Sequence, residues 1–137
     1  MSQIKKLALK KGAHISPPAD PINFDTKPPL FSLEKLADGK YCLSALDQAH
    51  KAFFADSIYK RKNLPWAEIK KIDRHSLGIE KIARDSIKAP IPKFITDDVD
   101  HFLAFRFHDK KPMVGYRMRD VFYVLWFDHD FTLYDHG

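Results

Sequence analysis

Side chains that can hold a phosphate and transfer protons are concentrated in the last third of this 137-residue sequence. Arg106 and Arg117 carry guanidinium groups, which suit phosphate oxygens and the charge on a pentacoordinate phosphorus. Tyr134 and His136 are of the types that serve as general acids or bases. Other side chains suited to bind a polyanion or stack on a base are His108, Trp126, Lys70, Lys71 and Arg74.

The stretch 102–136 must position most of these residues, and its pattern predicts an antiparallel β-meander. Turn-forming residues at 109–112, 119–120 and 128–130 divide it into three to four strands. Alternation between the two faces then gives one apolar face and one mixed face. In this register Gly115 lies between Arg106 and Val124 and leaves a shallow depression. The apolar face is predicted to contain Leu103, Phe105, Phe107, Val114, Tyr116, Met118, Val121, Tyr123, Leu125, Phe127, Phe131 and Leu133.

The mixed face collects the arginines, His108, Trp126, Tyr134 and His136. Aromatic rings beside arginines can stack bases and hold phosphates. The alternative is a half-solvated sheet face, partly covered by the N-terminal segment, whose arginines pair with Asp128 or Asp120. Both interpretations remain open on the sequence.

Helical patterns precede the predicted sheet. An apolar stripe over residues 45–59, with a capping-box-like start at Ser44 and Asp47, predicts the longest helix. Pro65 and Trp66 open another helix, and Gly78 marks a turn or close contact. Helices followed by consecutive strands predict an α+β fold: two to four helices, then a C-terminal antiparallel β-meander of three to four strands packed on them.

The N-terminal segment is predicted to form an irregular arm. Residues 1–30 begin with lysines and continue through five prolines, which disfavour helix and central strand. Ile22 and Phe24 are its expected anchors. The predicted domain organisation is therefore a proline-rich arm, residues 1–30, and a single α+β domain, residues 31–137.

The net charge of +5 is unevenly distributed. Residues 1–92 hold 17 Lys and Arg against 10 Asp and Glu, a net +7, whereas residues 93–137 hold 6 against 8, a net −2. A polyanionic partner fits this excess, and so does an ordinary lysine-rich surface. The single Cys42 excludes an intramolecular disulfide framework. Without a secretory or membrane-spanning apolar run, we expect a cytoplasmic protein.

A metal site has weak support. Asp128, His129 and Asp130, with His101, His108 and His136, offer suitable ligand types. Asp-His-Asp is also the ordinary composition of a polar turn, and no metal-ligand spacing is present. No cofactor is therefore expected.

A basic domain with helices before a sheet carrying Arg106 and Arg117, and with Tyr134-Asp135-His136 at its end, resembles the RelE/ParE superfamily of bacterial toxins. The resemblance covers residues 45–136 and rests on topology and residue type. It implies metal-independent mRNA cleavage on the ribosome and an antitoxin partner. It also implies phosphate or transition-state binding by the arginines, with Tyr134 or His136 as general acid or base.

Three functions from different classes follow. The first is a toxin-like mRNA endoribonuclease of a toxin–antitoxin system. The second is a non-catalytic nucleic-acid-binding module that uses the basic helical half. The third is a protein-interaction module, from a mobile element or defence locus, that uses the arm or a sheet edge.

Overall fold

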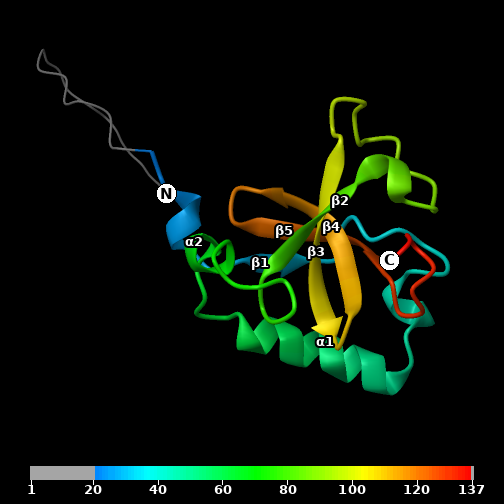
Figure 1. Ribbon diagram of the computed structural model, residues 1–137, viewed down its shortest axis with the longest axis horizontal. Coiled ribbons are helices and arrows are strands. Elements are labelled where there is room, and N and C mark those ends of the chain that lie inside the picture. Colours follow the sequence, from blue (N-terminus) through cyan, green and yellow to red (C-terminus); the bar gives the residue numbers. More distant parts are fainter. Residues whose placement is uncertain (1–20, 137) are drawn as a thin grey trace, which may run out of the picture.

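The computed structural model describes residues 21–136, which form an α+β fold (Figure 1). The α+β class predicted from the sequence is confirmed. Two helices, α1 (Gln48–Lys60) and α2 (Trp66–Ile69), accompany five strands within the described residues. The strands are β1 (Leu30–Ser32), β2 (Ile79–Ala83), β3 (His101–His108), β4 (Lys111–Met118) and β5 (Val121–Phe127). Three short 3-10 helices, η1 (Phe24–Thr26), η2 (Leu43–Ala45) and η3 (Arg84–Ser86), lie in the connections.

The five strands form one mixed sheet in the order β1-β5-β4-β3-β2. The predicted meander is present as β3, β4 and β5, paired antiparallel. Two further strands extend it: β2 pairs antiparallel with β3, and β1 pairs parallel with β5. The predicted antiparallel meander is therefore confirmed, but the sheet that contains it is mixed and has five strands. The segment after β5, expected as a fourth strand of the meander, contains no strand up to residue 136.

Helix α1 begins three residues after the predicted start. Asp47, and not Ser44, caps it, because its carboxylate accepts a hydrogen bond from the backbone N–H of His50 at 2.8 Å. The helix lies across the ends of β3 and β4 (Figure 1) and buries Phe54 against Phe127. Helix α2 begins at Trp66, one residue after the predicted start, because Pro65 has an extended conformation and is the N-cap.

Two irregularities in strand pairing decide which side chains share a face. Phe107 is an extra residue between the pairs Arg106–Pro112 and His108–Lys111. Leu125 is an extra residue in β5, opposite the step from Val114 to Gly115. Because side chains alternate along a strand, each extra residue reverses the faces beyond it. The predicted division into one apolar and one mixed face is therefore wrong.

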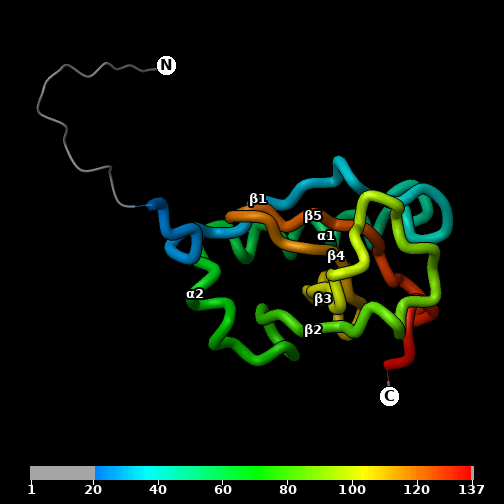
Figure 2. Tube along the Cα trace, turned by 90° about the horizontal axis from the view of Figure 1, so that it is seen from above, coloured from blue at the N-terminus to red at the C-terminus, as the bar shows by residue number. Residues whose placement is uncertain are grey.

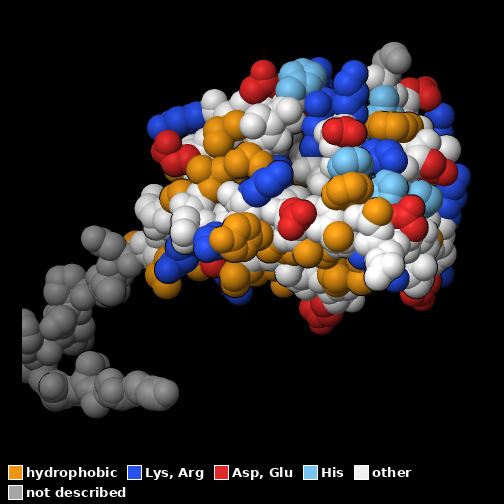
Figure 3. Space-filling model, turned by 90° about the horizontal axis from the view of Figure 1, so that it is seen from below, with side chains coloured by type: hydrophobic (Ala, Val, Ile, Leu, Met, Phe, Trp, Pro, Cys, Tyr) orange, Lys and Arg blue, Asp and Glu red, His pale blue; other side chains and the backbone are white. Residues whose placement is uncertain are grey.

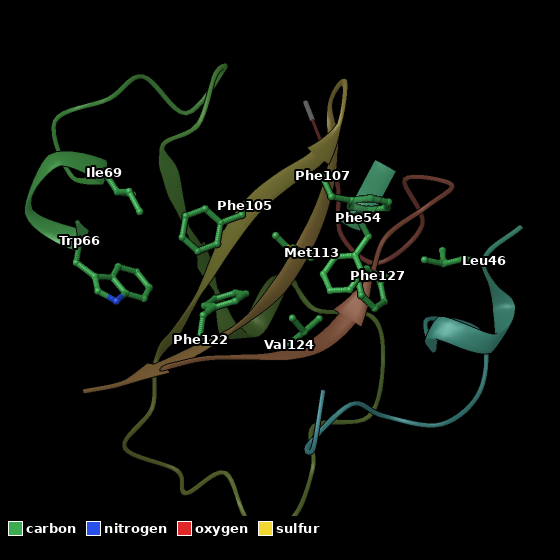
Figure 4. Packing of buried hydrophobic residues seen from close by; sticks show 10 residues of the cluster. All are labelled: Leu46, Phe54, Trp66, Ile69, Phe105, Phe107, Met113, Phe122, Val124 and Phe127. Carbon is green, nitrogen blue, oxygen red and sulfur yellow. The ribbon is translucent and has the colours of Figure 1, made fainter. Parts of the chain in front are cut away.

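Both faces of the sheet are covered by apolar side chains. On the helix side, α1 and α2 pack over one cluster, shown in Figure 4: Leu46, Phe54, Trp66, Ile69, Phe105, Phe107, Met113, Phe122, Val124 and Phe127. The second cluster comprises Ile82, Ile95, Phe102, Ala104, Val114, Leu125, Trp126, Leu133 and Tyr134. Its cover comes from irregular segments, including the C-terminal one, which lies beside the sheet in Figure 2.

Gly115 occupies a crowded position and leaves no depression between Arg106 and Val124. It pairs with Leu103 and Val124, and a Cβ there would collide with the Tyr123 carbonyl oxygen. Gly78 is a close contact, as predicted, because a Cβ would meet the carbonyl oxygens of the preceding loop.

The predicted N-terminal arm falls mostly on residues 1–20, which lie outside the described part. Of the two expected anchors, Phe24 is half-buried in η1, but Ile22 is 63% exposed and is not an anchor. Residue 30 already belongs to β1, so the end of the predicted arm is part of the sheet. No helix within residues 21–136 has the length and apolar character needed to cross a bilayer.

Candidate functional site

Arg117, one of the two predicted catalytic arginines, is engaged in an ion-pair cluster on the helix side of the sheet. Its Nη2 donates to Asp25 Oδ1 at 2.6 Å, and its guanidinium lies 4.2 Å from the centre of the Trp66 ring. Lys70 donates to the other oxygen of Asp25 at 2.7 Å. These two cations lower the pKa of Asp25 below its ordinary value. The arrangement fastens η1 to α2 and β4, and Arg117 has no part in the pocket described next.

Arg106 lies on the opposite face, at the wall of a cavity of about 130 Å³ that we call the Arg106 pocket. Two further predicted catalytic residues, Tyr134 and His136, line the same cavity, and so does the predicted binding residue Arg74. The structure therefore brings four of the predicted site residues together. The remaining lining residues are Glu80, Ala104, Lys110, Pro112, Phe131 and Asp135.

His136 is held in the pocket by a buried carboxylate. Its Nε2 lies 2.7 Å from Oδ2 of Asp128, a side chain with no solvent exposure. The other oxygen of Asp128 accepts hydrogen bonds from the backbone N–H groups of Thr132 at 2.9 Å and Leu133 at 3.2 Å. This carboxylate therefore fixes both the C-terminal turn and the imidazole. With Nε2–H donated to Asp128, a neutral His136 keeps Nδ1 as its proton acceptor.

Tyr134 lies beside His136, with the two rings stacked and their centres 4.1 Å apart. The side chain is only 6% exposed. Burial, reinforced by the nearby carboxylates of Glu80 and Asp128, raises the pKa of its hydroxyl well above the ordinary value. Tyr134 therefore keeps its proton at physiological pH and can serve as a hydrogen-bond donor or an acid, but not as a base.

The Arg106 pocket carries more positive than negative charge. Arg74 is paired with Glu80 at 2.8 Å, whereas Arg106 and Lys110 form no ion pair with another described residue. The carboxylate of Asp135 is paired with Lys88, whose Nζ donates a hydrogen bond to Asp135 Oδ1 at 2.8 Å. Lys, Arg and His side chains gather at the upper right of the face shown in Figure 3.

Arg61, which is fully buried, holds the backbone at Arg106 in place. Its guanidinium donates to the carbonyl oxygens of Ser57 at 3.1 Å, Leu77 at 3.0 Å and Arg106 at 3.3 Å. It also lies 4.7 Å from the centre of the Phe105 ring. Burial lowers the pKa of Arg61 to about 10, so the group is still charged at neutral pH. Arg61 thus ties α1 and the loop before β2 to the strand that carries Arg106.

The other predicted binding residues lie elsewhere. Lys70 belongs to the Asp25 cluster, and Lys71 is exposed beside Glu68. His108 stacks on Phe53 with ring centres 3.6 Å apart, in a neighbouring cavity that also includes Arg106. Trp126 is 1% exposed within the second cluster, so its prediction as a substrate-binding surface is wrong.

Sequence reasoning missed several residues of the site. Asp128 was assigned to a polar turn, although the structure makes it the buried partner of His136. Phe131 was placed on the apolar face and is 42% exposed at the pocket rim. The sequence carries no signal for this pair, because an aspartate in a polar turn has the same pattern whether it faces solvent or an imidazole.

Metal ligands are not clustered in this part of the chain. Among residues 21–136 no group of three or more His, Cys, Asp or Glu side chains is arranged to hold a metal ion.

Comparison with protein-family models, curated proteins and solved structures found no match for the chain. The site is therefore interpreted from its own geometry.

Proposed function

We propose that the protein is an RNA endonuclease that acts at the Arg106 pocket through its own side chains. The observation that carries this proposal is the pair formed by buried Asp128 and His136, which places an oriented imidazole in a cationic cavity beside Arg106. An imidazole held by a carboxylate is a competent general base. Arginines and a lysine around it supply the positive charge that a phosphodiester needs.

The proposed cleavage is a transesterification that needs no co-reactant. His136 Nδ1 removes the proton of a ribose 2′-hydroxyl, whose oxygen then forms a bond to the adjacent phosphorus. The bond from phosphorus to the 5′-oxygen of the next nucleotide breaks, and that oxygen takes up a proton. The products are a 2′,3′-cyclic phosphate and a free 5′-hydroxyl. Arg106 and Arg74 stabilise the charge on the pentacoordinate phosphorus.

Tyr134, whose ring stacks on that of His136, supports the same reaction. Because the raised pKa keeps its hydroxyl protonated, Tyr134 donates a hydrogen bond to the phosphate or a proton to the leaving 5′-oxygen. This assignment narrows the role implied by the resemblance to RelE/ParE toxins, in which either Tyr134 or His136 was the acid or base. His136 becomes the base and Tyr134 the donor.

The proposal is tested with purified full-length protein and a fluorescent single-stranded RNA, in buffer containing EDTA. We expect cleavage that yields 2′,3′-cyclic phosphate ends. An otherwise identical oligonucleotide with 2′-deoxyribose throughout must remain intact, because it lacks the attacking hydroxyl. Cleavage of the deoxy substrate, or products with a 5′-phosphate, would contradict the mechanism.

The resemblance to RelE/ParE toxins adds a cellular expectation. We propose that the protein acts on mRNA at the ribosome and that an antitoxin restrains it. Inducible expression of the wild type should arrest growth, while a His136→Ala variant produced at the same level should not. Equal growth of both cultures, with intact mRNA, would count against a toxin role even if the purified protein cleaves RNA.

A further inference from the structure

Phe131 is an aromatic side chain held at the surface in an unfavourable backbone conformation. Its φ of +62° lies in the left-handed region, which bulky side chains rarely adopt, and 42% of the residue is exposed. The backbone N–H groups of the next two residues, Thr132 and Leu133, donate hydrogen bonds to Asp128, and these bonds hold the turn that contains Phe131. The fold thus keeps an apolar ring in solvent where a glycine or a polar residue would be the ordinary choice.

The ring stands between two cavities. One is the Arg106 pocket, and the other is a larger cavity of about 540 Å³ that shares Arg106, Lys110 and Phe131 with it. His136 is the nearest aromatic neighbour, but the two rings are almost perpendicular, at 85°, with centres 5.0 Å apart. Phe131 therefore has no parallel stacking partner among the described residues.

The two cavities differ in size, as the phosphate and the nucleoside of a nucleotide do. The Arg106 pocket, at about 130 Å³, has about a quarter of the volume of the second cavity, and its small size suits a phosphate group. The second cavity, at about 540 Å³, is a hollow that is widely open to solvent and large enough to receive a nucleoside. Its wall adds His75 and Lys111 to the shared cations, with Asp109 as its single acid. A nucleic-acid strand could pass from one cavity to the other along Phe131.

We infer that Phe131 is a stacking platform for an unpaired base, and that the substrate class of this site is single-stranded RNA. The inference rests on the proposed function for the bond that is cleaved, but base stacking is a separate property. The base lies on the Phe131 ring in the larger cavity, and an adjoining phosphate lies in the Arg106 pocket. A paired base in a duplex cannot reach the ring because its faces are already stacked on its neighbours.

Three fluorescent RNAs test this inference by anisotropy with the full-length protein: a single strand, the same strand annealed to its complement, and the same strand with abasic sites. The variants are Phe131→Leu, which keeps apolar bulk without a π face, and Phe131→Trp, which keeps the π face. Phe94→Leu is the matched control, because Phe94 is also exposed, at 51%, and lines neither of the two cavities.

The wild type, Phe131→Trp and Phe94→Leu should bind the single strand best, and Phe131→Leu should lose at least about fivefold in affinity for it. Phe131→Leu should bind the abasic strand as the wild type does. Equal affinity of Phe131→Leu and wild type for the single strand would overturn the inference. So would wild-type protein that binds the single strand and the duplex equally well, or that binds no RNA.

Cleavage measured in the same samples separates the two claims. Unchanged binding by Phe131→Leu with normal cleavage overturns the stacking platform and leaves the proposed reaction standing. Base-dependent binding that is lost in Phe131→Leu supports the platform even where no cleavage is detected, and in that case only the nuclease proposal fails.

Discussion

Arg106 and Arg117 lie on neighbouring strands of the same sheet but project from its opposite faces. Arg117 faces the helices, where it stacks on Trp66 and pairs with Asp25. Arg106 faces the cavity that contains Tyr134 and His136. The two arginines therefore cannot act on one phosphate, and their substitution should have different consequences: loss of stability for Arg117 and loss of activity for Arg106.

Asp128→Asn should reduce RNA cleavage while leaving the fold largely intact. An asparagine oxygen can still accept the hydrogen bonds from Thr132 and Leu133, but the amide no longer supports the imidazolium that His136 forms as it takes up a proton. We expect the cleavage rate to fall by about 10²-fold or more. Single-turnover cleavage at several pH values measures the change, and an unaltered rate and pH profile would show that Asp128 has only a structural role.

Arg61→Met should destabilise the protein strongly. It keeps much of the side-chain volume beside Phe105 but removes the donors to the carbonyl oxygens of Ser57, Leu77 and Arg106. Each buried carbonyl oxygen left without a donor costs roughly 1–3 kcal/mol of unfolding free energy. Urea denaturation followed by tryptophan fluorescence measures this loss. Arg61→Lys retains a charge but not the planar array of donors, so its unfolding free energy should lie between those of the wild type and Arg61→Met.

Asp25→Asn should lower stability at neutral pH and have little effect in acid. Lys70 and Arg117 depress the pKa of folded Asp25 below the ordinary 3.8. Its contribution to stability is therefore present above about pH 4 and is lost as the pH falls through the folded pKa, when the carboxylate is protonated in both states. Urea denaturation of wild type and variant should show a constant difference from pH 5 to 7 that shrinks below pH 4. A difference that does not change down to pH 2 would show that the ion pairs are not its source.

Features that depend on local sequence pattern were predicted correctly, whereas features that depend on strand pairing were not. Helix α1 followed from its apolar stripe, and the turn at Arg119 was correct because Met118 pairs with Val121. The faces of the sheet were wrong beyond each extra residue, Phe107 and Leu125, since a bulge reverses alternation without altering composition. Strands β1 and β2 are short edge strands, and their pairing partners lie far along the chain.

The candidate site shows the same division. Residue type alone selected Arg106, Tyr134 and His136, and the structure places these three residues around one cavity. It also selected Trp126 and Arg117, whose chemistry is equally suitable but whose side chains are occupied in the fold. The buried partner of His136 could not be assigned, because an aspartate in a polar turn has the same sequence pattern whether it faces solvent or an imidazole.

The central claim is most directly tested by comparing the cleavage of one single-stranded RNA by Arg106→Ala and Arg117→Ala, in EDTA and at equal concentrations of folded protein. A temperature below the unfolding transition of both variants, checked by circular dichroism, keeps stability out of the comparison. The structure predicts that Arg106→Ala loses about 10²-fold or more in rate, while Arg117→Ala cleaves within a few-fold of the wild type. Loss of cleavage in Arg117→Ala with full activity in Arg106→Ala would contradict the assignment of the Arg106 pocket as the active site.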